Sequence, residues 1–301
     1  MLQNALPPSA RLLRSPEAVA LLKQIEHRVV SVTFTPSSRP VAVPTAVVHH
    51  PASGFPTDAG PPLLLLPGFD SSLLEFRSLL PRLTSRSVWA LDTLGFGFTA
   101  QPAATPINRL TIRQHLYRSW QLIDRPVALV GASLGGAIAM DFALAHPACV
   151  DRLILINSVG FSGHFPLGPL LFSPLDDWGA EWLRLRKRAF YQAVSALPWG
   201  DRGREAALCA SIHQERPDWR QAILSFTKSG GYGGIDRHIH TIRQPTLVLW
   251  GENDDVLGME DAEKFERAIP HSRLIKIDAG FHTPHLTNPR AVADAIQDFL
   301  K

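Results

Sequence analysis

Residues 126–147 read PVALVGASLGGAIAMDFALAHP, and this stretch decides the fold class. An apolar run typical of a buried strand breaks at Gly131, presents Ser133, and passes through two more glycines into an apolar pattern with helical spacing. A strand that turns sharply into a helix needs an unusual backbone conformation at its central residue, and small neighbours let the two elements approach each other. Such a turn raises the hydroxyl above the sheet, beside helix N–H groups that can hold an oxyanion. The pattern therefore predicts that Ser133 is a nucleophile.

Short apolar segments and amphipathic helices alternate along most of the chain. The expected strands cover residues 63–69, 87–97, 126–133, 150–158, 245–251 and 272–279. The expected helices cover residues 71–83, 111–123, 134–146, 260–269 and 288–300, the last with Asn288 as its N-cap. Repeated strand–helix–strand units build a mostly parallel sheet with helices on both faces. The sequence therefore predicts an α/β protein with a doubly wound sheet.

The N-terminal part follows a different pattern. Residues 15–27 combine a serine N-cap, a proline at the first helical position and apolar residues at helical spacing, which predicts a helix. Residues 28–34 and 41–50 are rich in valine and are separated by a loop. This pattern predicts an antiparallel hairpin ahead of the parallel strands.

The alternation stops between residues 159 and 243, where helix-like pieces rich in Trp, Phe, Pro and Gly replace the strands. We expect one α/β core in two parts, residues 29–158 and 244–301, preceded by a helix-bearing segment at residues 1–28. The helical insertion at residues 159–243 is the expected cap, because ligands bind beyond the carboxyl ends of such strands and an insertion leaving there would roof that crevice. Its aromatic residues suit an apolar ligand and include Phe165, Phe172, Trp178, Trp182 and Trp199.

Composition excludes several classes of protein. The 301 residues carry a net charge of only +3, spread along the chain, which does not indicate nucleic-acid binding. Cys149 and Cys209 have no metal-like or redox-like spacing, and no metal or organic cofactor is implied. No apolar run has the length of a signal peptide or of a membrane span. We therefore expect a cytoplasmic protein without a transmembrane segment.

A serine hydroxyl needs a general base at neutral pH. The chain has 12 histidines, and their positions relative to the expected strands indicate which one is the base. His282 follows the last expected strand, so it lies at the same carboxyl edge of the sheet as Ser133. His285 lies close by and remains the alternative. Pro284 separates the two, so we expect His282 to face the serine and His285 to pack behind it.

The base in turn needs a carboxylate that fixes its tautomer. Asp254 follows the expected strand at residues 245–251 and is the candidate, on the strength of the chain order Ser, Asp, His. Glu252 and Asp255 in the same loop are alternatives.

An oxyanion hole needs two backbone donors. The N–H of Leu134, directly after the nucleophile, is the first. The turn after the strand at residues 63–66 offers the N–H of Phe69 as the second.

With these motifs in order, the chain resembles the α/β-hydrolase superfamily, in particular capped enzymes that include esterases, lipases, epoxide hydrolases, haloalkane dehalogenases and carbon–carbon hydrolases. The resemblance extends from about Val29 to the end of the chain. The motifs that carry it are LLLLPGFDSS, ALDTLGFGFT, VGASLGG, VLWGENDDVL and GFHTPHL. The segments LLLLPGFDSSLLEFRSLLPRL and FTKSGGYG also resemble a group of cyanobacterial and plastid hydrolases. The resemblance implies that Ser133 is the nucleophile, Asp254 the acid and His282 the base.

The chain departs from the family pattern at three places. Pro67 stands where a histidine commonly precedes the oxyanion glycine, which leaves the geometry of that loop open. Phe281 stands where glycine is frequent, which keeps His285 as the alternative base. The carbon–carbon hydrolases usually carry tryptophan after the base, and here Thr283 takes that place.

The type of nucleophile restricts which reactions of this superfamily we expect. The dehalogenases and epoxide hydrolases of this superfamily use aspartate at the turn, whereas Ser133 predicts an acyl-enzyme. We expect a carboxylic-ester hydrolase acting on a small to medium apolar acyl group. The alternatives are a carbon–carbon hydrolase, a thioesterase, and a ligand receptor of this fold with little turnover. The sequence predicts no oligomeric state.

Overall fold

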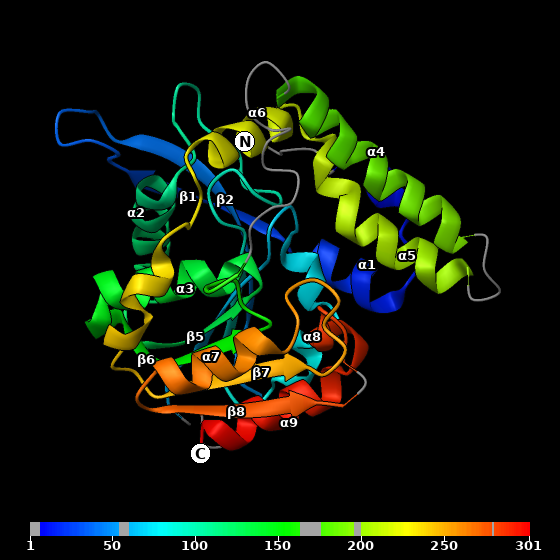
Figure 1. The fold of residues 1–301 in the computed structure, drawn as a ribbon. Coiled ribbons are helices and arrows are strands. Elements are labelled where there is room, and N and C mark those ends of the chain that lie inside the picture. The colour runs from blue at the N-terminus through cyan, green and yellow to red at the C-terminus, as the bar shows by residue number, and fades with distance from the viewer. Residues whose placement is uncertain (1–6, 54–59, 163–175, 196–199, 279) are drawn as a thin grey trace.

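The computed structural model describes residues 7–53, 60–162, 176–195, 200–278 and 280–301. Within these ranges, eight strands form one sheet in the order β1-β2-β4-β3-β5-β6-β7-β8 (Figure 1). The strands are β1 (Glu26–Val32), β2 (Val41–His50), β3 (Leu63–Leu66), β4 (Val88–Leu91), β5 (Val127–Ala132), β6 (Val150–Ile156), β7 (Thr246–Gly251) and β8 (Ser272–Ile277). Strand β2 pairs antiparallel with β1 and β4, and all other neighbours are parallel. The predicted α/β sheet with an N-terminal antiparallel hairpin is confirmed.

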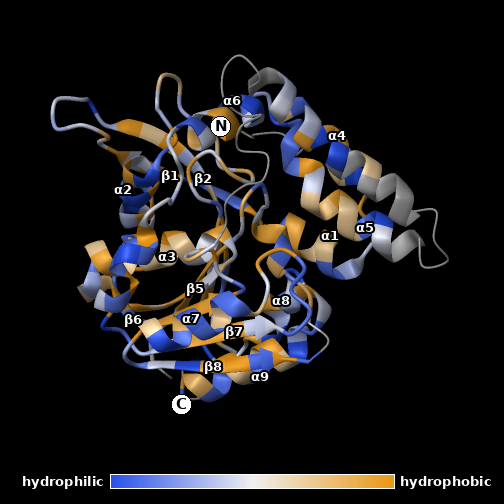
Figure 2. Ribbon diagram, in the orientation of Figure 1, coloured by the Kyte–Doolittle hydropathy of each residue, from blue (hydrophilic) through white to orange (hydrophobic). Residues whose placement is uncertain are grey.

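Helices cover both faces of the sheet. The helices of the core are α1 (Pro16–Lys23), α2 (Arg109–Trp120), α3 (Leu134–Ala145), α7 (Glu260–Ala268), α8 (Pro284–Thr287) and α9 (Pro289–Phe299). Successive strand residues alternate between faces, so Leu64 and Leu66 of β3 pack in the cluster that includes α2, α3 and α7, whereas Leu63 and Leu65 join α1 and α9. The middle strands are accordingly hydrophobic over most of their length (Figure 2).

The structure differs from two of the local structures expected from the sequence. Residues 71–83 form two short 3₁₀ segments, η2 (Leu73–Phe76) and η3 (Leu80–Arg82), instead of one helix. The N–H of Leu73 donates to Asp92 Oδ1, and Pro81 has no N–H to continue a helical ladder. Asn288 occupies the N-cap position of α9, but its amide donates to Asp278 O and makes no cap bond.

The segment between β6 and β7 contains, in its described residues, helices and no strand. They are α4 (Asp176–Ser195), α5 (Gly200–Ser211), η6 (Ile212–Glu215), α6 (Trp219–Lys228) and η7 (Ile235–Thr241). Helices α4 and α5 lie side by side beyond one end of the sheet (Figure 1). We propose that residues 159–243 form the cap. None of the helices in the described ranges is long and apolar enough to cross a bilayer.

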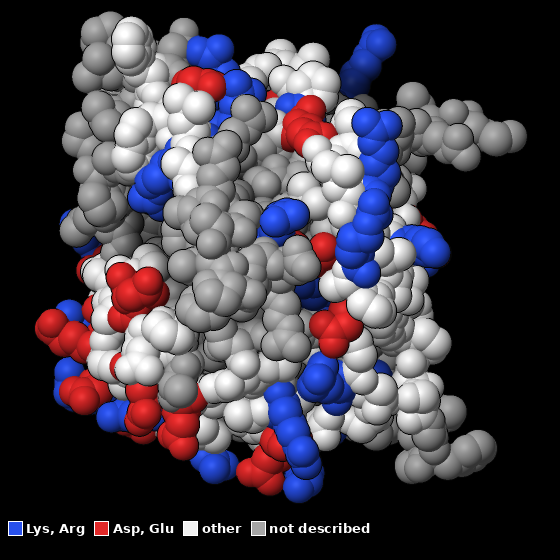
Figure 3. Space-filling view, turned by 90° about the vertical axis from the view of Figure 1, so that its right-hand side faces the viewer, with Lys and Arg blue, Asp and Glu red and all other residues white. Residues whose placement is uncertain are grey.

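The expected cap aromatics fall into two groups. Phe165, Phe172 and Trp199 lie outside the described residues, whereas Trp178 and Trp182 are exposed on α4. On the side of the molecule that α4 and α5 occupy, Lys and Arg side chains are scattered among neutral ones, and acidic side chains gather at one corner (Figure 3). This scatter agrees with the small net charge of +3.

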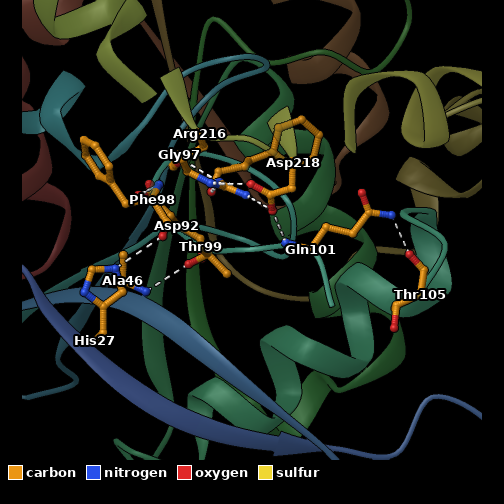
Figure 4. Close-up of polar contacts among 11 residues, drawn as sticks. His27, Ala46, Asp92, Gly97, Phe98, Thr99, Gln101, Thr105, Arg216 and Asp218 are labelled. Carbon is orange, nitrogen blue, oxygen red and sulfur yellow. Dashed lines mark hydrogen bonds and ion pairs between the residues drawn. The ribbon is translucent and has the colours of Figure 1, made fainter. Parts of the chain in front are cut away.

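A buried carboxylate organises the loop that follows β4. Asp92 is fully buried and accepts hydrogen bonds from the N–H groups of Leu73 (2.6 Å) and Phe98 (2.7 Å). Gly97 lies beside it with φ +53°, where a Cβ would come within 2.1 Å of Asp92 Cγ (Figure 4). Burial raises the pKa of Asp92 to about 7, although the two backbone hydrogen bonds offset part of the rise.

The raised pKa of Asp92 predicts a pH-dependent stability. Between about pH 4 and pH 7 the folded protein holds a proton that an unfolded aspartate has lost, so this stabilisation is complete below about pH 4 and is lost as the pH rises through about 7. Relative to Asp92→Asn, we expect the wild-type free energy of unfolding to fall by roughly 4 kcal/mol across this window. Urea denaturation at a series of pH values measures the difference. Parallel curves for the two proteins would contradict it.

Candidate active site

Ser133 occupies the sharp turn between β5 and α3, with φ +50° and ψ −116°. The glycines around it are required by close backbone approach. A Cβ on Gly131 would lie 2.3 Å from Gly135 O, and a Cβ on Gly135 would lie 2.2 Å from Leu66 O. The backbones of β5, α3 and β3 therefore approach one another so closely that only glycine fits at positions 131 and 135. The turn also holds Ser133 in a backbone conformation that is rare for residues with a side chain.

The three side chains that the sequence selected lie in one chain of hydrogen bonds. His282 Nε2 is 3.0 Å from Ser133 Oγ, and His282 Nδ1 is 3.0 Å from Asp254 Oδ1. The side chain of Asp254 is fully buried and that of His282 is 18% exposed. Each residue follows a different parallel strand, so the contact joins the carboxyl ends of β5, β7 and β8.

The surroundings of Asp254 favour its ionised form. Burial alone would raise the pKa of this carboxyl, but the hydrogen bond and charge of His282 and the N–H groups of Val256 and Leu257 outweigh burial and lower it. The two N–H groups donate to Oδ1 at 2.9 and 3.1 Å. A charged carboxylate can therefore hold the imidazole in one tautomer and stabilise its protonated form.

Asn157, at the end of β6, is a contact of the site that the sequence did not single out. It is fully buried with φ +41°. Its Nδ2 donates to Asp254 Oδ2 at 2.6 Å, and its Oδ1 accepts from the N–H of Gly251 at 3.0 Å. In the sequence, the one sign of this role is that a polar residue ends a buried strand. The sequence does not show the contact itself, because Asp254 lies 97 residues further along the chain. Asn157 thus holds both the carboxylate of Asp254 and the start of the loop that carries it.

We expect Asn157→Ala to lower kcat by roughly 10–100-fold with little change in KM, because it leaves Asp254 Oδ2 buried without this donor and frees the carboxylate to turn. Steady-state kinetics of the purified variant measure the effect. Asn253→Ala is the matched control, since Asn253 directly precedes Asp254 in the loop after β7 and its side chain is exposed. Equal kcat values for both variants would show that Asn157 does not orient the acid.

The alternative residues lie apart from this chain of contacts. Glu252 and Asp255 are exposed to solvent. His285 is buried, with Nε2 3.4 Å from Glu75 Oε1 and its ring 5.4 Å from that of Phe76. His285 therefore packs behind the site, as its separation from His282 by Pro284 suggested.

The two segments that carry the expected oxyanion donors lie next to Ser133. Leu134 is the first residue of α3, so its N–H has no acceptor within the helix. A Cβ on Gly68 would lie 3.3 Å from Ser133 Cβ, which places the loop after β3 against Ser133. The N–H of Gly68 donates to Glu75 at 3.2 Å, so the next donor along this loop is the N–H of Phe69. Glu75, which the sequence did not indicate, therefore supports the loop in which Pro67 replaces the usual histidine.

Two cavities lie away from this site. One of about 600 Å³ lies between the N-terminal segment and α5 and includes Leu12 and Leu208 in its lining. The other, of about 360 Å³, is open to solvent along α6 and includes Leu224. Ser133, Asp254 and His282 do not line either cavity.

The fold and site define a class of protein, and comparison with known proteins agrees. Residues 63–295 match the model of the alpha/beta hydrolase family, and the chain belongs to this family. It is therefore a hydrolase.

Individual relatives are similar over most of the chain. The alpha/beta hydrolase domain-containing protein VTE7 of Arabidopsis thaliana is 33% identical over 250 residues, which cover 79% of this chain and 73% of that protein. The 2-hydroxy-6-oxo-2,4-heptadienoate hydrolase of Pseudomonas putida is 29% identical over 256 residues, 80% of this chain and 90% of that protein. An esterase structure from Exiguobacterium antarcticum superposes with a TM-score of 0.71 at 17% identity, covering 91% of this chain and 99% of the esterase, and shows the shared fold.

Proposed function

We propose that the chain hydrolyses carboxylic esters with a small to medium apolar acyl group, with Ser133, His282 and Asp254 as its catalytic triad. The observation that carries the proposal is the continuous hydrogen-bond chain from Asp254 through His282 to Ser133 at a strained turn. A hydroxyl in contact with an imidazole, which is itself oriented by a carboxylate, is the arrangement that activates a serine nucleophile.

The proposed reaction proceeds in two halves. His282 Nε2 takes the proton of Ser133 as Oγ attacks the ester carbonyl, and the N–H groups of Phe69 and Leu134 stabilise the oxyanion. The imidazolium then protonates the leaving alcohol, and the acyl group stays on Ser133. Water, deprotonated by His282, attacks the acyl-enzyme and releases the acid. Asp254 remains ionised throughout, in keeping with its lowered pKa.

Aromatic rings beside the proposed oxyanion loop support an apolar substrate. The ring of Phe69 lies 6.0 Å from that of Phe96 and 5.8 Å from that of Phe226, between ring centroids. Phe281, directly before the proposed base, is 52% exposed. Phe96 and Phe226 are buried, whereas Phe69 is partly exposed. An acyl chain placed against the rings of Phe69 and Phe281 therefore leaves water, which favours binding in proportion to its apolar area.

A second reaction deserves a test because the Pseudomonas putida relative is named as a hydrolase of 2-hydroxy-6-oxo-2,4-heptadienoate. In that case the leaving group is a carbon atom rather than an alcohol oxygen. The two reactions share the serine, the base and the acid, and they differ in how the leaving group receives its proton.

A substrate panel separates these functions. The purified protein is given p-nitrophenyl esters of graded chain length, matching acyl thioesters, and 2-hydroxy-6-oxo-2,4-dienoates, with Ser133→Ala as the blank. The proposal predicts many turnovers on esters and an optimum at short to medium chain length. Turnover restricted to the dienoates would replace it by carbon–carbon hydrolysis, and turnover restricted to the thioesters by thioester hydrolysis. A single burst without further turnover would indicate a receptor.

A further inference from the structure

A buried carboxylate lies next to the proposed oxyanion donor and faces the cap. Asp70 is 4% exposed and has φ +49°, a left-handed conformation that aspartate tolerates better than most residues. Its Oδ1 accepts from Trp219 Nε1 at 2.7 Å and lies 3.0 Å from His213 Nε2, and its Oδ2 accepts from Gln214 Nε2 at 2.7 Å. A buried carboxylate is costly unless it is hydrogen-bonded, so these contacts stabilise one arrangement strongly.

All three partners come from one side of the molecule. His213 and Gln214 belong to η6, and Trp219 is the first residue of α6, so each lies in the insertion between β6 and β7. Asp70 belongs to the loop that follows β3 in the core. The separations along the chain are 143 to 149 residues. One core side chain thus binds the cap through donors from two successive elements.

The loop that carries Asp70 is held at three points by carboxylates. Glu75 accepts from the N–H of Gly68 before Phe69, and Asp92 accepts from the N–H of Leu73 after it. Asp70 lies between these anchors and directly follows Phe69. It is the anchor that ties the loop to the cap instead of to the core.

We propose that Asp70 is a positioning residue: by binding η6 and α6 it sets the N–H of Phe69 for the oxyanion and couples the cap to that geometry. This inference rests on the proposed function, because it assigns Phe69 to the oxyanion hole. Donors in such a site act only at the position that the oxyanion occupies, and small displacements are expensive in rate. The cap therefore contributes to catalysis through this loop as well as by covering the site.

The same cap segment has a second attachment that provides a matched control. Arg216 donates to Gly97 O at 2.6 Å, and Asp218 Oδ2 accepts from the N–H of Gln101 at 2.6 Å (Figure 4). Arg216 and Asp218 also pair with each other. These bonds attach the cap to the loop after β4, which carries no proposed oxyanion donor. The printed contacts of the Asp218 side chain are with Gln101 and Arg216, so Asp218→Asn weakens this second attachment and leaves every donor to Asp70 in place.

The test compares Asp70→Asn with Asp218→Asn in the full chain. Asp70→Asn keeps the size of the side chain but turns one acceptor into an NH₂ group facing a donor. Active sites are counted with a fluorophosphonate, kcat and KM are measured on a short p-nitrophenyl ester, and Ki is measured for a matching trifluoromethyl ketone, whose adduct carries an oxyanion. We expect Asp70→Asn to lower kcat per active site by about 10²-fold, with a similar rise in Ki and a nearly constant KM. Asp218→Asn is expected to lower Tm alone.

A second, milder variant keeps the inference testable if Asp70→Asn does not fold. Trp219→Phe removes one donor to Asp70 and keeps an aromatic ring, so it is expected to shift kcat and Ki in the same direction by a smaller factor. If Asp70→Asn does not fold, this variant carries the test.

Each contrary outcome has a distinct meaning. Unchanged Ki in Asp70→Asn or, where it does not fold, in Trp219→Phe would overturn the inference, as would equal kinetic losses in Asp218→Asn. Ser133→Ala must form no ketone adduct. An adduct on that variant, or a wild type without ester turnover, would remove the proposed function itself and this inference with it.

Discussion

Ser133→Ala is expected to abolish ester hydrolysis, lowering kcat by roughly 10⁶-fold, while the melting temperature stays close to that of the wild type. The substitution removes one hydroxyl from a turn whose shape is set by the glycines around it, and the contact with His282 Nε2 at 3.0 Å is lost. Without that oxygen no acyl-enzyme can form, and the remaining donors can only assist attack by water.

The control is a serine from the adjoining strand end. Ser158 is buried, follows β6, and donates to Val159 O. Ser158→Ala is expected to keep turnover, although it loses that hydrogen bond. Comparable loss of activity in both variants, with both folded, would indicate damage to the sheet edge instead of loss of a nucleophile.

His282→Ala is expected to remove nearly all hydrolysis, again by about 10⁶-fold, at every pH. The imidazole is the only group of the proposed triad that can receive the serine proton, and its other nitrogen is held by Asp254 at 3.0 Å. In the wild type, activity is expected to fall in acid, because a protonated imidazole cannot accept that proton.

His285→Ala separates the role of the base from the role of packing. His285 is buried against Phe76 and near Glu75, so its loss leaves a cavity and lowers stability. We expect this variant to melt earlier but to keep the wild-type acid limb in its rate profile. The reverse pattern, with activity lost in His285→Ala and retained in His282→Ala, would make His285 the base.

Much of the fold was predictable because it depends on local patterns. Short apolar runs define most of the parallel strands. In β3, residues 63–66 point alternately to the two faces of the sheet, as successive residues of any strand do. The helix expected at residues 71–83 was wrong because Pro81 lacks the N–H that an α-helical ladder needs, and the segment forms two short 3₁₀ segments instead. Helical spacing of apolar residues does not reveal that interruption.

The candidate site likewise contains residues that the sequence predicted and residues that it did not. Ser133, Asp254 and His282 were expected to converge because parallel strands end at one edge, and the structure brings them into contact. The residues that hold this arrangement could not be selected from sequence. Asn157, Glu75 and Asp70 act through partners that are distant in the chain or lie in irregular loops. Only the assembled sheet and cap show which buried polar side chain meets which partner.

The most direct test of the proposed chemistry is to identify the residue that a fluorophosphonate modifies in the wild-type protein. The labelled protein is digested, and the modified peptide is sequenced by mass spectrometry. We expect one label per chain, on Ser133, with labelling slowed strongly in His282→Ala because the hydroxyl is then not activated. A label on another serine, or an unlabelled Ser133 in protein that turns over esters, would contradict it.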